Sequence, residues 1–139
     1  MEGKLKNILL CEDDEIDRMT IKRAFSKIKS TAILHEATNG EEGLDFLSDS
    51  NNARPDLILL DINMPRMNGL EFLKKVKENP EWSVIPVVIL TSSNEEKDRL
   101  ESFVTGSSGY MMKPVDFDQF VETIKIINQY WSRSELGHK

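Results

Sequence analysis

The chain has 139 residues, and its 24 acidic against 18 basic residues give a formal net charge of −6 at pH 7. This acidic balance argues against nucleic acid as a partner, and no apolar run approaches the roughly 18 residues that span a bilayer. The lone cysteine, Cys11, cannot form an internal disulfide, and the acidic run that follows it is unlike a secretory signal. We therefore expect a cytoplasmic protein with one globular domain.

Short apolar runs of strand length alternate along the chain with longer stretches of helical periodicity. The predicted strands are Ile8–Cys11, Ile33–Ala37, Leu57–Leu60, Val87–Leu90 and Tyr110–Met112. Three of these runs are continuously apolar, which is typical of strands covered on both faces of a parallel sheet.

The intervening stretches predict five helices, and four of them show an apolar stripe at a 3.6-residue period. The stripe of the first is Ile21, Ala24, Phe25 and Ile28, that of the third includes Leu70, Leu73 and Val76, and that of the fourth is Leu100, Phe103 and Val104. The fifth is the clearest, with Phe117, Phe120, Val121, Ile124, Ile127 and Trp131. Asp116 and Gln119 have the spacing of a capping box at its start.

Five alternations of strand and helix imply right-handed crossovers and a doubly wound α/β sheet of five parallel strands. No repeat, low-complexity tract or linker divides the chain. We expect a single domain over residues 1–139, with its core at about residues 5–131 and a short tail over residues 132–139.

Polar residues directly follow four of the predicted strands. They are Glu12, Asp13 and Asp14 after the first strand, Asp61 after the third, Thr91 after the fourth and Lys113 after the fifth. These residues therefore lie at the carboxyl ends of the strands, which is where open parallel sheets bind their ligands. Carboxylates that converge there repel one another unless they share a hard cation such as Mg²⁺. With a lysine and a hydroxyl donor beside them, the set predicts phosphoryl chemistry.

Each of these residues also has a purely structural interpretation. Capping or strand-end roles suit Glu12, Asp13, Asp14 and Asp61, and a simple turn suits Lys113–Pro114. Ser93 and Glu96 have the spacing of a cap for the fourth helix. The structural interpretation is strong for each residue alone, but their joint occurrence, in order and at strand ends, favours a functional site.

Four motifs together resemble the receiver domain of two-component response regulators. They are Leu9-Leu10-Cys11-Glu12-Asp13-Asp14, Leu59-Leu60-Asp61-Ile62-Asn63-Met64-Pro65, Val88-Ile89-Leu90-Thr91-Ser92 and Gly109-Tyr110-Met111-Met112-Lys113-Pro114. The resemblance covers about residues 5–131 and is to the single-domain type that includes the chemotaxis regulator. It implies a flavodoxin-like fold with strand order 2-1-3-4-5 and a site at the point where that order reverses.

The resemblance also implies roles for the acidic residues. Asp61 would be the phosphoacceptor, which takes a phosphoryl group from the phosphohistidine of a sensor histidine kinase. Asp13, Asp61 and the backbone carbonyl of Asn63 would bind Mg²⁺ directly, and Glu12 would reach it through water. Asn63 and Ser93 occupy positions where family members tune their autodephosphorylation.

By the same resemblance, Lys113 would pair with the phosphoryl oxygens, and Thr91 would donate its hydroxyl to another of them. Tyr110 matches the switch aromatic, whose ring turns inward when Thr91 moves towards the phosphoryl group; the structural alternative is a half-buried strand residue. The Lys113–Pro114 bond would be cis. Gly43 stands where alanine is usual and would weaken the second helix by about 1 kcal/mol.

Two apolar groups lie off the predicted core stripes and are candidate partner surfaces. Ile16, Met19 and Thr20 of the first helix lie beside the acidic edge and would dock the kinase, with chance surface exposure as the alternative. Ile126, Tyr130 and Trp131 of the fifth helix would form a homodimer or target patch. The alternative is that these three residues pack under the tail Ser132–Lys139.

The leading hypothesis is a stand-alone response regulator that binds a downstream protein and catalyses only its own phosphorylation and slow autodephosphorylation. A phosphorelay intermediate, which passes the group to a histidine phosphotransfer protein, fits the sequence equally. An aspartate-nucleophile phosphohydrolase is less favoured, because such enzymes usually carry a general acid two residues after the nucleophile. Asn63 stands there and cannot exchange a proton at neutral pH. The intact acid set disfavours a receiver that is never phosphorylated.

Overall fold

The computed structural model describes residues 5–133 as five strands that alternate with five helices. The strands are β1 (Asn7–Cys11), β2 (Ile33–Ala37), β3 (Leu57–Leu60), β4 (Val87–Thr91) and β5 (Gly109–Met112). The helices are α1 (Glu15–Lys27), α2 (Gly40–Ser48), α3 (Gly69–Glu78), α4 (Glu96–Thr105) and α5 (Phe117–Arg133). The predicted strands and helices are therefore confirmed.

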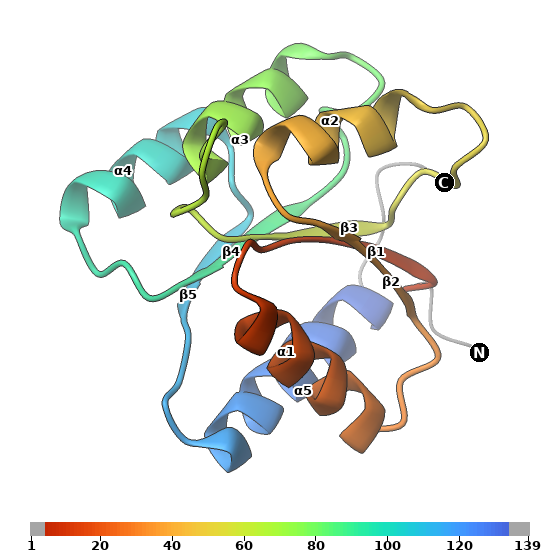
Figure 1. Ribbon diagram of the computed structural model, residues 1–139, viewed down its shortest axis with the longest axis vertical. Helices are drawn as coiled ribbons and strands as arrows, with labels where there is room; N and C mark the ends of the chain where they lie inside the picture. Colours follow the sequence, from red (N-terminus) through yellow and green to blue (C-terminus); the bar gives the residue numbers. More distant parts are fainter. Residues whose placement is uncertain (1–4, 134–139) are drawn as a thin grey trace.

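The five strands form one parallel sheet in the order β2-β1-β3-β4-β5, as predicted. Helices α1 and α5 cover one face of this sheet, and α2, α3 and α4 cover the other (Figure 1). The strand order reverses between β1 and β3, so the carboxyl ends of these two strands flank the switch point of the fold.

The core has one layer on each side of the sheet, and the central strands β1, β3 and β4 are buried almost throughout. On one side, the predicted stripe of α1 packs against Phe120, Ile124 and Ile127 of α5. On the other side, α3 contributes Phe72, Leu73 and Val76. The periodicity of α1, α3 and α5 therefore identified their buried faces correctly.

The predicted apolar stripe of α4 is wrong. Leu100 is 50% exposed, Phe103 45% and Val104 88%, whereas the residue of α4 that is buried is Ser102. The buried Ser102 hydroxyl has a hydrogen-bond partner within its own helix, because it donates to the carbonyl of Arg99 at 2.8 Å. Helix α4 packs on α3 and β5, and its buried position is taken by this small side chain while its larger apolar residues lie at the surface.

Gly43 has a packing role that its helix propensity does not show. A Cβ at this position would lie 2.7 Å from Cε1 of Phe72 and 3.1 Å from Sγ of Cys11. The glycine therefore lets α2 approach α3 and the sheet more closely than alanine would. The lower helix propensity of glycine, which we expected to weaken α2, is therefore accepted in exchange for this close packing.

Two local expectations are corrected at the ends of β4 and β5. The Lys113–Pro114 bond is trans, which is the form that X–Pro bonds prefer by about 0.5–1 kcal/mol. Ser93 is not the cap of α4: the N-cap position belongs to Glu95, and the Ser93 hydroxyl instead donates to Asp98 Oδ2 at 2.8 Å.

The cap predicted for α1 and one of the two bonds of the capping box predicted for α5 are found. Asp14 caps α1 by accepting from the backbone N–H groups of Ile16 and Asp17. At the start of α5, the side chain of Asp116 accepts from the backbone N–H of Gln119 at 3.1 Å. Within residues 5–133, no helix is both long enough and apolar enough to traverse a lipid bilayer.

Candidate functional site

The backbone brings the predicted site residues to one edge because the parallel ladder continues one residue beyond the strands. The N–H of Asp61 donates to the carbonyl of Cys11 at 3.0 Å, and that of Lys113 donates to the carbonyl of Thr91 at 2.8 Å. The N–H of Glu12 likewise donates to the carbonyl of Ala37, the last residue of β2, at 2.9 Å. Residues from four strands are thereby fixed at the switch point.

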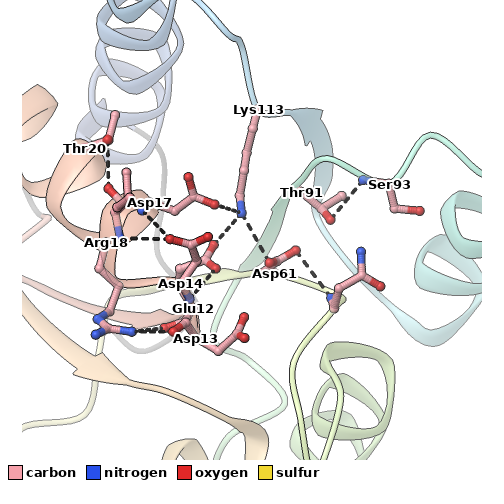
Figure 2. Close-up of polar contacts among 12 residues, drawn as sticks. Glu12, Asp13, Asp14, Asp17, Arg18, Thr20, Asp61, Thr91, Ser93 and Lys113 are labelled. Carbon is pink, nitrogen blue, oxygen red and sulfur yellow. Dashed lines mark hydrogen bonds and ion pairs between the residues drawn. The ribbon is translucent and has the colours of Figure 1, made fainter.

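Lys113 lies at the centre of the acidic cluster (Figure 2). Its Nζ is 2.6 Å from Oε1 of Glu12, 2.8 Å from Oδ2 of Asp17 and 3.2 Å from Oδ2 of Asp61. An ammonium group has three N–H donors, so each donor has one carboxylate partner. The side chain of Lys113 is only 7% exposed, which makes these contacts largely shielded from water.

Burial and charge shift the titration of the two innermost groups. Burial raises the pKa of Glu12 to about 7; the hydrogen bond from Lys113 lowers it in part, and the charge of Asp61 raises it further. Burial alone would lower the pKa of Lys113, but its bonds to Asp17 and Glu12 outweigh burial and raise that pKa above its usual range. The cluster is therefore short of positive charge even with Lys113 in place.

Three of the predicted metal ligands come together. One carboxylate oxygen from each of Glu12, Asp13 and Asp61 lies within 4.8 Å of the others, with Asp13 on the exposed side. This all-oxygen donor set fits a hard divalent cation such as Mg²⁺. Asn63 follows Asp61 closely, and its N–H lies 3.4 Å from Asp61 Oδ1. The role of the Asn63 carbonyl as a further ligand stays a prediction.

The loop after β4 connects Thr91 to Tyr110. Thr91 is fully buried, and its Oγ1 accepts from the N–H of Ser93 at 3.2 Å. The hydroxyl of Tyr110 donates to the carbonyl of Ser93 at 2.8 Å. The half-buried Tyr110 ring packs against the α3 side of the core, with its centroid 6.4 Å from that of the exposed Phe103. The candidate switch residues are thus joined through one backbone position.

Two residues of α1 belong to the site although the sequence did not identify them. Asp17, which appeared only as an acid favourable to the helix dipole, contacts Lys113. Arg18 donates from Nη1 to the carbonyls of Glu12 and Asp13, both at 2.9 Å, and so holds the backbone of the acidic pair. Local spacing gave no signal for the contact of Asp17, because its partner Lys113 lies 96 residues away in the sequence.

The residues proposed for the two partner surfaces differ in their exposure. On α1, Ile16 is 73% exposed and Met19 53%, and Thr20 donates to the carbonyl of Ile16 at 2.8 Å. On α5, Ile126 and Tyr130 are exposed, whereas Trp131 packs partly on the core and meets the Tyr130 ring edge-on. The alternative that the tail covers this patch involves residues 134–139, which lie outside the described part of the chain.

Comparison with known proteins identifies the family. The sequence profile of the response regulator receiver domain matches residues 8–125. Response regulator Rcp1 of Synechocystis sp. is 34% identical over 133 residues, which cover 91% of this chain and 88% of Rcp1.

Solved structures agree with the sequence matches. The phosphorylated cyanobacterial phytochrome response regulator RcpA superposes with a TM-score of 0.89 at 32% identity and covers 94% of this chain and 97% of its own. The Mn²⁺-bound form of Rcp1 superposes with a TM-score of 0.86 at 31% identity, over 94% of this chain and 98% of its own. Together with the five-stranded fold and the acidic cluster at its switch point, these matches show that the chain belongs to the receiver domain family of two-component response regulators.

Proposed function

We propose that the chain is a stand-alone response regulator that accepts a phosphoryl group from a sensor histidine kinase on Asp61. The observation that carries this proposal is the position of Asp61. Its carboxylate is 6% exposed, lies 3.2 Å from the ammonium of Lys113 and shares a ligand cluster with Glu12 and Asp13. The phosphorylated state named for RcpA and the bound Mn²⁺ named for Rcp1 support the same chemistry here.

In the proposed transfer, a carboxylate oxygen of Asp61 bonds to phosphorus while the bond from phosphorus to the kinase histidine nitrogen breaks. The product is an aspartyl phosphate. Lys113 passes the hydrogen bond that it now gives Asp61 to a phosphoryl oxygen, and the hydroxyl of Thr91 donates to another. A Mg²⁺ ion held by Glu12, Asp13, Asp61 and the Asn63 carbonyl would supply charge that offsets the negative charge of the transferred group.

The proposed output is a change in the surface of α4, β5 and α5. Thr91 gives up its bond with the Ser93 N–H when it turns to the phosphoryl group. The carbonyl of Ser93 accepts a hydrogen bond from the Tyr110 hydroxyl, so the loop and the ring are expected to move together. Leu100, Phe103 and Val104 of α4 lie exposed at this surface, where a downstream protein could read the change.

The remaining assignments follow from the exposed residues. Ile16, Met19 and Thr20 are proposed to dock the kinase beside the acceptor, and the Ile126, Tyr130 and Trp131 patch is proposed for self-association or a target. Asn63 and Ser93 are proposed to tune the slow loss of the phosphoryl group. The protein would turn over no other substrate, because Asn63 stands where an aspartate-based phosphohydrolase needs a general acid.

The direct test is phosphorylation by acetyl phosphate in the presence of Mg²⁺, followed by intact-mass measurement. The wild type is expected to gain the mass of one phosphoryl group, and Asp61→Asn is expected to gain none. Asp45→Asn, which removes an exposed carboxylate of α2 outside the site, is the matched control and should be modified like the wild type. Phosphate on the Asp61→Asn protein would show that another residue is the nucleophile.

Mg²⁺ at millimolar concentration is expected to raise the melting temperature, because the ion binds the clustered carboxylates of the folded state only. Binding at 100 times the dissociation constant stabilises a protein by about 2.7 kcal/mol. Asp13→Asn should abolish most of this shift, as measured by thermal denaturation with Mg²⁺ or EDTA.

The control for the Mg²⁺ experiment is Asp14→Asn. Asp14 is the exposed cap of α1 and is not one of the three clustered ligands. Its asparagine variant should therefore melt with the same Mg²⁺ shift as the wild type. A wild-type melting temperature that is identical in Mg²⁺ and EDTA would argue against the metal site.

A further inference from the structure

Asp17 links the first helix to the reactive lysine. It lies in the first turn of α1, and its Oδ2 is 2.8 Å from Nζ of Lys113, which directly follows the carboxyl end of β5. This contact is shorter than the 3.2 Å between Lys113 and Asp61 (Figure 2). The ammonium therefore lies nearer to the carboxylate of Asp17 than to that of Asp61.

All three N–H donors of Lys113 are engaged, by Glu12, Asp17 and Asp61. A phosphoryl group on Asp61 adds oxygens beyond the present carboxylate, and Lys113 must approach them to pair with them. Glu12 is 1% exposed and fixed at the end of β1, whereas Asp17 is 33% exposed on the rim of the site. Asp17 is thus the partner that holds the ammonium on the outer side, towards α1.

We propose that Asp17 is a positioning residue that competes with the phosphoryl group for Lys113 and so lowers the affinity of the site for that group. This inference rests on the proposed function of Asp61. Asp17 adds a fourth carboxylate to Glu12, Asp13 and Asp61, and its charge opposes an incoming phosphoryl anion. Removing its charge should weaken the hold on one donor of Lys113, because a neutral amide oxygen accepts less strongly than a carboxylate, and should lower this repulsion.

Asp17→Asn is a clean substitution for testing the proposal. The cap of α1 uses the backbone N–H of Asp17 and not its side chain, so the helix start is preserved. Glu15→Gln is the matched control: it removes the same charge from the same turn of α1, and Glu15 is exposed. Asp17→Glu restores the charge and is expected to behave like the wild type.

The measurement is the affinity for beryllofluoride, a mimic of the phosphoryl group, in saturating Mg²⁺. Asp17→Asn is expected to bind about five-fold more tightly than the wild type, as fits loss of a partly exposed ion pair, and Glu15→Gln less than two-fold more tightly. In metal-free protein, the ¹⁵N resonance of the Lys113 ammonium should shift in Asp17→Asn and stay unchanged in Glu15→Gln. A merely structural role of Asp17 would not produce this pattern.

Two different failures can be distinguished. If the wild type binds beryllofluoride and Asp17→Asn binds it equally or more weakly, the competition is overturned while the proposed function stands. If the wild type does not bind beryllofluoride at all, both are overturned. Thermal denaturation of each variant establishes that the compared proteins are folded.

Discussion

Replacing Lys113 with methionine is expected to lower the free energy of unfolding of the metal-free protein by about 3 kcal/mol at pH 8. Glu12 and Asp61, which are 1% and 6% exposed, would lose the cation that lies between them, so a charge on the buried Glu12 becomes more costly. Breaking a buried pair by removing one partner is costly for this reason. Methionine keeps most of the lysine stem, so a cavity does not explain the expected loss.

The deficit of the Lys113→Met protein should shrink as the pH falls. The folded-state pKa of Glu12 is already raised, to about 7, and loss of Lys113 removes an influence that lowers it. A group whose pKa is raised by folding adds stability below its unfolded pKa, and this stability is lost as the pH rises through the folded value. Relative to the wild type, the variant should therefore be less impaired at pH 5.5, where Glu12 takes up a proton, than at pH 8.

Urea denaturation in EDTA at these two pH values measures the effect. Lys22→Met is the control, because Lys22 pairs with Glu36 at 2.9 Å on the surface, where both side chains are at least one-third exposed. Its loss should cost less than about 1 kcal/mol at either pH. Equal losses for the two variants at pH 8 would mean that Lys113 does not neutralise a buried cluster.

The composition of this cluster shows what could be predicted from the sequence. Glu12, Asp61, Thr91 and Lys113 were identifiable because each follows an apolar run, and parallel strands bring their carboxyl ends to one edge. Asp17 was not identifiable in the same way. Its contact depends on how α1 is rotated about its own axis over the sheet, and that rotation is set by tertiary packing.

The errors in the other helices have related causes. Periodicity identified the buried faces of α1, α3 and α5, because each of these helices contributes several large apolar side chains to a core layer. In α4, the apolar stripe is exposed and the helix packs through Ser102. In α2, helix propensity marked Gly43 as a weakness, whereas contact with Phe72 requires it. In both cases the outcome depends on how one element packs on its neighbours, and local sequence pattern does not encode that packing.

Gly69→Ala is expected to be more damaging than any loss of a surface contact. A Cβ at Gly69 would lie 2.2 Å from the backbone oxygen of Asp61 and 2.8 Å from the Cα of Ile62. The obstacle is backbone and cannot rotate away, so either the start of α3 or the loop that carries Asp61 must move. Overpacking of this kind costs about 3 kcal/mol, at the upper end of the usual range.

Gly109→Ala separates this steric effect from the general effect of replacing a glycine. The nearest atoms to a Cβ at Gly109 are the methyl groups of Val88, at 3.8 Å, which is ordinary van der Waals contact. Urea denaturation should therefore show little change for Gly109→Ala, within about 0.5 kcal/mol. If both alanine variants are equally stable, the packing at Gly69 is looser than the structure shows.

The same substitution should also impair the site in molecules that remain folded. The carbonyl that a Cβ at Gly69 would crowd belongs to Asp61, the proposed phosphoacceptor. The N–H of Gly69 donates at 2.9 Å to the carbonyl of Ile62, which directly follows Asp61. Acetyl phosphate should therefore label folded Gly69→Ala more slowly than folded Gly109→Ala at a temperature well below both melting points. Equal labelling rates would mean that α3 moves while the loop holding Asp61 keeps its position.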